Sequence, residues 1–376
     1  VVGYGVQKKS DVTGAMARVG EKELKAMPVR NALEGMQGKT AGVDITSSQR
    51  PGEVGNINIR GQRSINAEQG PLYVVDGMVI QNGGIENINP SDIEAIDILK
   101  DASATAIYGS RGANGVILVT TKKGKEGKVT LNYSGTVTFE TLHDVTEMMS
   151  AAEWLDYARL AKYNAGSYAS ATPTYEADKA AFGSVTASWK NIEKAWVNGV
   201  YDPSLVGSYD WASHGKQTGI THEHTLSASG GSDKFQGYAS FGYLDQKGTQ
   251  PGQAYERYTL KTSFDVTPVN WFKMGSSINA SYSTQDYGYS FSKSVTGSGD
   301  FYSALRSMIP WTVPYDENGE YVRYPSGDVN IINPIRELDY NTNQRRTFRA
   351  SASLYSQIDF GKIWKPLEGL SYRLQF

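Results

Sequence analysis

A glycine-rich stretch is the part of this 376-residue sequence that most suggests chemistry. It reads DASATAIYGSRGANGVILVTTKKG (residues 101–124), with Gly109, Gly112 and Gly115 at intervals of three before the apolar run Val116–Val119. Phosphate-binding loops of this kind need either G-x-x-x-x-G-K-[ST] or a G-x-G-x-x-G that opens a helix. Neither pattern is present, and the β-branched sequence VILVTT predicts a strand. We therefore favour a structural turn over a nucleotide site.

The turn interpretation divides this stretch into three elements. We expect a short helix from Ala102 to Tyr108, a tight turn from Gly109 to Gly115 that carries Arg111, and a strand from Asn114 to Thr121. Glycine allows one backbone segment to pass close to another in a crowded interior. No ligand is needed to explain the spacing.

Two other motifs have residue types that bind metals. His222 and His224 in THEHTL lie on the same face of an expected strand, but two ligands are too few for a zinc site and no third His or Cys is nearby. The segment YDENGEYVRY (residues 315–324) lacks the spacing of a calcium loop, and Asn318-Gly319 is typical of a hairpin turn. We expect no metal and no cofactor.

Composition excludes several other function classes. The chain has no cysteine, which excludes a thiolate metal site or a cysteine nucleophile, and its net charge of −2 argues against nucleic acid as a partner. The sequence contains no G-x-S-x-G, no H-E-x-x-H and no convincing pair of acidic residues. We therefore expect that the protein is not an enzyme.

The first 125 residues combine short helices and strands with many Gly and Asn turns. VRNALEGMQGK places Val29, Leu33 and Met36 at helical spacing after Pro28. INIRG and LYVVDG are typical of short strands that end at glycine. In PSDIEAIDILKD, Ser91 and Glu94 fit a capping box and are followed by alternating isoleucines, which predicts a turn of helix and then a strand.

From about residue 127 the sequence alternates between apolar and polar residues in long segments. In LNYSGTVTF, apolar Leu131, Tyr133, Val137 and Phe139 share one face. YTLKTSFDV, FKMGSSINASY, FRASASLYSQIDF and LSYRLQF continue the pattern. Such segments suit transmembrane β-strands, which need about 9 to 11 residues, better than the shorter strands of a soluble sandwich. The mean hydropathy of −0.44 and 24 tyrosines agree with this interpretation.

The connections between these segments alternate in length, as in a bacterial outer-membrane barrel. Short turns are expected at 230–234, 268–270 and 361–369, a medium connection at 248–254, and long connections near 140–220 and 286–346. We count about seven strands. Because an odd number does not close a bacterial barrel, we expect the chain to be the N-terminal piece of a longer protein.

In order and spacing, several fragments resemble one family, the SusC/RagA-type TonB-dependent outer-membrane transporters of Bacteroidetes. They are VVGYGVQKKSDVTGA, LEGMQGKTAGVDI, INIRG, PLYVVDGMVI, INPSDIEAIDILKDASATAIYGSRGANGVILVTTKKG and HTLSASGGSDKFQGYASFGYLDQKG. The resemblance covers nearly the whole chain. It implies an α+β plug domain, here residues 16–125, followed by the first strands of an antiparallel 22-stranded transmembrane β-barrel, here residues 127–376.

The resemblance also implies partners and a location. TonB, driven by its ExbB/ExbD energy complex, would pair as a strand with a box region in residues 1–15, where Val1, Val2, Gly3, Tyr4 and Gly5 match the family. A SusD-like surface lipoprotein would cap the barrel. The barrel would contact outer-membrane lipid, with the plug exposed to the periplasm and the long loops to the exterior.

The resemblance predicts import of an oligosaccharide or glycan, with a peptide as a second choice. The expected outer loops are rich in aromatic residues, of which Tyr287, Tyr289 and Trp311 are candidates for substrate contact. Packing within the loops explains these aromatics equally well. We further expect plug charges such as Arg60 and Arg111 to face barrel carboxylates. The alternatives are a siderophore or cobalamin importer, and a receptor or signalling barrel that does not transport.

Overall fold

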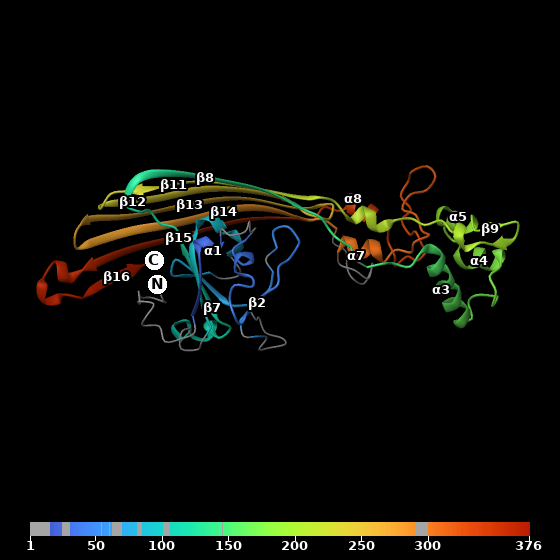
Figure 1. Cartoon of the computed structure of the whole chain (residues 1–376), viewed down its shortest axis with the longest axis horizontal. Coiled ribbons are helices and arrows are strands. Elements are labelled where there is room, and N and C mark those ends of the chain that lie inside the picture. The colour runs from blue at the N-terminus through green and yellow to red at the C-terminus, as the bar shows by residue number, and fades with distance from the viewer. Residues whose placement is uncertain are drawn as a thin grey trace.

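The computed structural model describes residues 16–24, 31–53, 55–59, 61, 70–80, 85–100, 106–144, 146–289 and 300–376. The chain forms three parts (Figure 1). A long sheet, called the wall sheet, contains β8 and β11–β16. The N-terminal domain, residues 16–121, lies against one face of that sheet. The loop layer, residues 141–218 and 288–343, lies beyond one end of the sheet.

The N-terminal domain is built on a five-stranded sheet in the order β1-β6-β7-β4-β5. The pair β4–β7 is parallel and the others are antiparallel. A separate ribbon pairs β2 with β3. Its apolar core includes the fully buried side chains of Ile96, Ile98 and Ile117. The strands are β1 (Met16–Gly20), β2 (Val43–Ile45), β3 (Ile57–Ile59), β4 (Leu72–Val75), β5 (Met78–Ile80), β6 (Ile93–Leu99) and β7 (Val116–Thr121).

Helices in the described part of this domain are short. They are α1 (Glu21–Leu24) and the 3-10 turns η2 (Glu34–Met36), η3 (Ile85–Asn87), η4 (Pro90–Asp92) and η5 (Ala106–Gly112). The helix expected over VRNALEGMQGK is therefore only a 3-10 turn within the described residues, and Pro28 and Val29 lie outside them. A helical turn followed by a strand is confirmed at η4 and β6, although the N-cap is Asn89 and not Ser91.

The glycine-rich stretch forms a turn, as predicted. The η5 segment is kinked at Gly109, which has φ of 60°, and Gly115 has φ of 91°. A Cβ atom on Gly115 would lie 2.6 Å from the Cδ1 atom of Ile59. Gly115 is therefore required both by its left-handed backbone and by the close approach of the β3 strand. Residues 102–105 of the expected helix lie outside the described part.

The wall sheet has seven antiparallel strands in the order β16-β15-β14-β13-β12-β11-β8. Apart from β16, each strand has 13 or more residues. The long alternating segments are thus confirmed as strands. They are β8 (Gly127–Glu140), β11 (Gly219–Gly231), β12 (Phe235–Lys247), β13 (Gln253–Val269), β14 (Phe272–Tyr287), β15 (Gln344–Asp359) and β16 (Ser371–Gln375).

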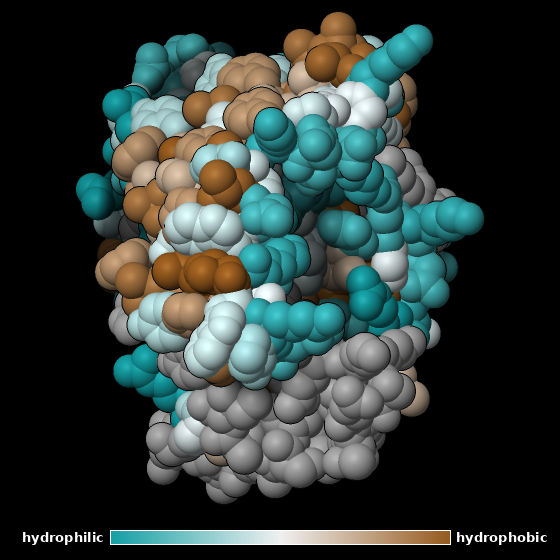
Figure 2. Space-filling view, turned by 90° about the vertical axis from the view of Figure 1, so that its left-hand side faces the viewer, coloured by the Kyte–Doolittle hydropathy of each residue, from teal (hydrophilic) through white to brown (hydrophobic). Residues whose placement is uncertain are grey.

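The wall sheet is apolar on its exposed face and polar on its buried face, which is the reverse of a sheet in a soluble protein. Apolar side chains such as Leu131, Leu260 and Phe348 are exposed on the face away from the N-terminal domain. Polar side chains such as Lys261 and Ser263 are buried on the face towards it. Viewed from the end with the short turns, hydrophobic residues gather along one flank of the molecule and hydrophilic residues along the other (Figure 2).

The connections fall on opposite ends of the wall sheet according to their length (Figure 1). The long connections form the loop layer, with α3 (Ala151–Asn164), α4 (Tyr175–Phe182), α5 (Thr186–Glu193), β9 (Trp196–Val197), β10 (Val200–Tyr201), η6 (Pro203–Leu205), η7 (Trp211–Gly215), α7 (Phe301–Arg306) and α8 (Pro334–Tyr340). The β15–β16 turn carries η8 (Phe360–Lys362) and η9 (Lys365–Leu367). Within the described residues, no helix has the length and apolar character needed to cross a membrane.

Candidate functional site at the interface of the N-terminal domain and the wall sheet

The N-terminal domain is held against the wall sheet mainly by polar contacts. Among the described residues, each apolar core cluster lies within the N-terminal domain or within the loop layer, and none joins the N-terminal domain to the wall. The contacts between the two parts are hydrogen bonds and ion pairs between side chains distant in sequence. Separating such an interface costs less free energy than separating a dry apolar core, because its hydrogen bonds are replaced by hydrogen bonds to water.

One group of contacts is made by the η4 turn. The buried carboxylate of Asp92 accepts hydrogen bonds from the Tyr238 hydroxyl at 2.8 Å and from the Ser240 hydroxyl at 2.5 Å, both on β12. The Asn89 side-chain amide donates to the Thr225 hydroxyl on β11 at 2.9 Å. The N-cap position of Asn89 fixes the turn that presents both groups to the wall.

A second group of contacts centres on Asp76, in the turn between β4 and β5. Asp76 has φ of 49°, the left-handed region that a non-glycine residue seldom adopts. The backbone amide of Thr121 donates to Asp76 Oδ1 at 2.9 Å, and the hydroxyl of Ser277 on β14 donates to Oδ2 at 3.2 Å. Asp76 thus connects β7 of its own domain to the wall.

Lys261 on β13 is the cationic partner of Asp76, and only 2% of it is exposed. Its Nζ atom lies 3.8 Å from Asp76 Oδ2. The same Nζ donates to the Thr121 hydroxyl and, at 3.3 Å in each case, to Ser277 Oγ and Asn279 Oδ1. A lysine this deeply buried needs such a set of acceptors to offset its lost hydration. We call Asp76, Thr121, Lys261, Ser277 and Asn279 the buried latch.

The apex of the N-terminal domain, residues 48–53, contacts the wall near the loop layer. Gln285 on β14 donates to the Pro51 carbonyl at 2.8 Å, and the Arg50 guanidinium lies 5.9 Å from the ring centre of Tyr287. Arg50 also pairs with Glu53 at 3.1 Å. Charged and aromatic groups therefore meet where the apex contacts the wall near the loop layer.

The loop layer is itself fastened by a charged cluster around Asp144. Its carboxylate accepts a hydrogen bond from Tyr302 and lies 3.6 Å from Arg306 and 3.7 Å from Lys216. These residues come from both long connections. The hydrogen bond from Tyr302, followed by one from the Thr146 amide, lowers the pKa of Asp144.

Acid is expected to loosen the loop layer through Asp144. The pKa of this carboxyl is lower in the folded state than its unfolded pKa of about 3.9. Its contribution to the stability of the loop layer is therefore present above the unfolded pKa and is lost as the pH falls through the folded pKa. Protection of the loops from pepsin should therefore fall below about pH 4. Asp144→Asn should show weaker protection already at neutral pH, measured with trypsin. Asp202→Asn is the matched control, because the pKa of Asp202 is lowered by Ser204 within its own turn. Equal protection in both variants at neutral pH would contradict the role of Asp144.

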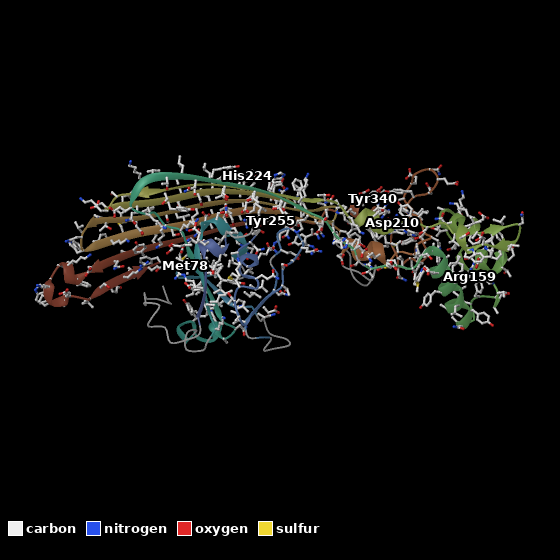
Figure 3. The ribbon with its side chains drawn as sticks, in the orientation of Figure 1. Met78, Arg159, Asp210, His224, Tyr255 and Tyr340 are labelled. Carbon is white, nitrogen blue, oxygen red and sulfur yellow. The ribbon has the colours of Figure 1, made fainter. Side chains whose placement is uncertain are left out.

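A second buried network stiffens the helical insert of α3–α5. Asp178 accepts from Arg159 Nε at 2.9 Å, from Tyr168 Oη at 2.7 Å and from Trp196 Nε1 at 3.0 Å. The Arg159 guanidinium lies over the Tyr201 ring, 4.0 Å from its centre. Burial and the hydrogen bond to Asp178 raise the pKa of Tyr168 to about 12. Arg159 lies in the part of the loop layer farthest from the wall sheet (Figure 3).

The aromatic residues predicted for substrate contact have different environments. Tyr289 is 1% exposed and packs on Phe301, while Trp311 is 4% exposed and packs on Phe182. These two side chains support packing within the loops, the alternative explanation of the sequence pattern. Tyr287 is partly exposed beside Arg50, so substrate contact stays a prediction for this residue.

Of the other predicted site residues, only Arg111 lies in the described part of the chain. Val1, Val2, Gly3, Tyr4, Gly5 and Arg60 lie outside the described residues. Arg111 is exposed and forms no ion pair with the described acidic groups. The expected pairing of Arg60 and Arg111 with barrel carboxylates stays a prediction.

The motifs that resembled metal sites form structural features. His224 lies on the outward side of the wall sheet, opposite in direction to Tyr255 (Figure 3), and its Nδ1 is 2.8 Å from the Tyr133 hydroxyl. Around Asn318-Gly319 the chain forms the predicted hairpin turn, because Tyr315 and Tyr321 form a β-bridge and Gly319 has φ of 80°.

Sequence reasoning missed the residues that hold the interface together. Asp76, Asp92 and Lys261 were not singled out, although two signals were present. The dipeptide Asp76-Gly77 is a strong turn signal. Lys261 is a charged residue on the polar face of an alternating strand, and in a membrane sheet that face points to the interior.

Comparisons with known proteins agree with this arrangement of domain and wall. Residues 8–116 match the family model of the TonB-dependent receptor plug domain. The whole chain is 33% identical to TonB-dependent receptor P39 of Formosa agariphila and covers 33% of that protein. It is 30% identical to TonB-dependent receptor SusC of Bacteroides thetaiotaomicron, over 94% of this chain and 33% of SusC. The chain thus spans about a third of the length of these curated relatives.

Solved structures give the same result. The open-open state of the RagAB peptide importer is similar over 100% of this chain and 41% of that chain, with a TM-score of 0.77 and 28% identity. The closed-closed state is similar over 97% of this chain and 40% of that chain, with a TM-score of 0.73 and 28% identity. Both similarities include the N-terminal domain, the wall sheet and the loop layer.

Proposed function

Because the chain belongs to the SusC/RagA family of TonB-dependent receptors, we propose that it supplies the gate and part of the wall of an outer-membrane nutrient importer. The N-terminal domain corresponds to the plug of these receptors, and the wall sheet to the first strands of their barrel. The family is one of transporters and not of enzymes.

The polar character of the interface is the observation that carries this proposal. A gate domain must separate from the wall sheet and bind to it again while the wall sheet stays folded. Asp92, Asn89 and the buried latch make specific hydrogen bonds across the interface. Among the described residues, no apolar core is shared by the N-terminal domain and the wall. Their hydrogen bonds can be replaced by water as the N-terminal domain moves, which keeps the net cost of displacement moderate.

TonB would act on the segment that precedes β1. Val1, Val2, Gly3, Tyr4 and Gly5 would pair with TonB as an added strand, and a pull on them would reach β1 first. Among the described residues β1 is an edge strand that pairs with β6 alone, so it can be detached without removing a central strand. In this proposal the N-terminal domain faces the periplasm and the loop layer faces the exterior.

Substrate would enter through the loop layer and meet the apex of the N-terminal domain. Arg50, Glu53 and Tyr287 lie together at that point and would make the first contacts. Arg60 and Arg111 would face carboxylates on other parts of the barrel.

The substrate would be an oligosaccharide or a peptide, captured beneath a SusD-like surface lipoprotein. Two observations move this proposal towards a peptide. The similar solved structures at 28% identity are of a peptide importer, and the burial of Tyr289 and Trp311 removes two of the candidate platforms for a sugar ring. The charged pair at the apex also suits a ligand that carries charges.

The two alternative functions have weaker support. A siderophore importer is favoured by the similarity to the probable siderophore receptor PirA of Acinetobacter baumannii, but that covers only 32% of this chain. A receptor that does not transport would bind its ligand without accumulating it.

Uptake in cells separates these functions. A strain lacking the full-length gene should lose growth on a nutrient from a panel of peptides and glycans, and the gene in trans should restore it. Accumulation of that nutrient should stop in cells without TonB, while surface binding remains. Binding without any accumulation in cells that have TonB would support the receptor instead.

A further inference from the structure

A groove of about 460 Å³ lies between the β4–β5 hairpin of the N-terminal domain and strands β14 and β15 of the wall. We call it the hairpin groove. Met78 lines it from the hairpin, on the side of the wall sheet that faces the N-terminal domain (Figure 3). Pockets that bind small molecules have volumes of about 300 to 1,000 Å³. The hairpin groove is therefore large enough to hold a ligand.

The wall side of the hairpin groove is polar. The strand register pairs Asn279 with Ser351 and Ser281 with Arg349, so these four groove-lining residues share one face of two neighbouring strands. Arg349 is the charged residue among the described residues that line the groove. Asn279 also belongs to the buried latch, because its Oδ1 atom accepts a hydrogen bond from Lys261 at 3.3 Å. The groove thus adjoins the contacts that hold the N-terminal domain against the wall.

The hairpin side of the hairpin groove is apolar. Met78, Val79 and Ile80 of β5 line it, and each is partly exposed. In the sheet order of the described residues β5 is an edge strand, so no further strand of the N-terminal domain covers this apolar surface. Ligand pockets commonly combine such an apolar surface with a few polar groups that fix the orientation of the ligand.

Arg349 forms a long ion pair with Glu86 of the η3 turn. Its Nη2 atom lies 3.8 Å from Glu86 Oε1, and 32% of the Arg349 side chain is exposed. A hydrogen bond between a guanidinium and a carboxylate is normally about 2.7 to 2.9 Å long. Glu86 is also held through its backbone, because its carbonyl accepts a hydrogen bond from Arg257 at 2.5 Å. A carboxylate that enters the groove can therefore approach Arg349 more closely than Glu86 does.

We infer that the hairpin groove is a binding subsite for a short peptide with an aliphatic side chain and a free carboxylate. The aliphatic side chain packs on β5, the peptide backbone forms hydrogen bonds with Asn279 and Ser281, and the carboxylate pairs with Arg349. An oligosaccharide has no aliphatic side chain to pack on β5. This inference rests on the proposed function and narrows its substrate class to peptides.

The position of the hairpin groove suits a second site below the apex. Gln285 contacts the apex, and Ser281 lines the groove four residues earlier on β14. This separation is about 13 Å, at ~3.3 Å per residue, in the direction of the short turns. A peptide that leaves the apex towards the short turns therefore reaches the groove and lies beside the buried latch.

Protection of an introduced cysteine tests the groove in the purified full-length protein. Ser351→Cys places a thiol in the hairpin groove, and Ser208→Cys places one on an exposed part of the loop layer as the control. The probes are a pool of N-acetylated tripeptides that end in leucine with a free carboxylate, called the acid pool, and the same tripeptides as C-terminal amides, called the amide pool. Mass spectrometry follows the reaction of each introduced cysteine with a maleimide. Migration on unheated gels confirms that each variant is folded.

The acid pool should slow the labelling of Ser351→Cys by about tenfold at roughly ten times its half-saturating concentration, and should leave Ser208→Cys unchanged. The amide pool should need about tenfold higher concentrations, because it lacks the carboxylate that pairs with Arg349. Adding Arg349→Gln should make the two pools equal, and Arg349→Lys should restore part of the preference for the acid pool. Met78→Ser should weaken the effect of both pools alike.

Unchanged labelling of Ser351→Cys with both pools would overturn the inference, and so would equal slowing at Ser208→Cys. A preference for the acid pool that survives Arg349→Gln would overturn the role of Arg349. Protection by an oligogalacturonate but not by the peptides would overturn the ligand class. Because these measurements need neither TonB nor uptake, they are independent of the test of transport in cells. Peptide uptake in cells without protection of Ser351→Cys would overturn the groove and leave the proposed function intact.

Discussion

Uptake by the full-length protein is expected to fall to the level of a TonB-deficient strain when Val1, Val2, Gly3, Tyr4 and Gly5 are deleted. The reason is that strand addition supplies the only mechanical connection between TonB and the gate in this account. Substrate binding at the cell surface should be unchanged, because the loop layer is untouched. Accumulation and surface binding of a labelled substrate are measured in parallel.

A matched pair of substitutions separates strand pairing from side-chain identity. Val2→Pro removes a backbone donor and disfavours strand pairing, whereas Val2→Ala keeps the donor. We expect Val2→Pro to lose most uptake and Val2→Ala to keep most of it. Normal uptake by the deletion variant would show that these residues do not couple the gate to TonB.

Removal of the Lys261 charge is expected to have the largest effect on the seating of the N-terminal domain. Lys261→Met leaves the carboxylate of Asp76 buried without its cationic partner, and breaking a buried pair in this way costs about 3 to 5 kcal/mol. The N-terminal domain should then leave its seat more often. Passive entry of a large hydrophilic antibiotic, which a seated plug blocks, should rise in growing cells.

A double variant tests whether the buried latch acts through charge pairing. Lys261→Met combined with Asp76→Asn removes both charges, so it should admit less antibiotic than Lys261→Met alone. Antibiotic entry that is the same in the single and double variants would mean that the pairing of Asp76 with Lys261 does not hold the gate. Folding is checked in both variants by migration on unheated gels.

The strands of the wall sheet were predictable from the sequence because successive side chains of a strand point to opposite faces. The two faces have different surroundings, so apolar and polar residues alternate along each strand. Leu131, Tyr133, Val137 and Phe139 fall on one face in the sequence, and the structure exposes all four on the outward side. The same logic predicted the strand after the glycine-rich turn, because four successive β-branched or apolar residues suit the buried β7 strand.

The interface was not predictable, because its contacts join residues far apart in sequence. Nothing near Asp76 indicates that Lys261 and Ser277 will face it, since that depends on which strands the N-terminal domain touches. Elsewhere a local signal was present and was missed. Ser150 and Glu153 form a capping box at the start of α3, yet the long connection was expected only as a loop.

The central claim is that the N-terminal domain must move relative to the wall for substrate to pass. Asn89 and Thr225 touch across the interface, with 2.9 Å between the amide nitrogen and the hydroxyl oxygen. Asn89→Cys combined with Thr225→Cys in the full-length protein places two thiols on these facing segments, and formation of the disulfide by oxidation is verified by mass spectrometry before uptake is measured. Each single variant, treated with the same oxidant, is the control.

Uptake is measured in cells carrying the double variant after oxidation and again after reduction. The account predicts that oxidation stops uptake, that reduction restores it, and that the single variants transport normally under both conditions. Full uptake by the oxidised, cross-linked protein would contradict the claim that the N-terminal domain is a movable gate.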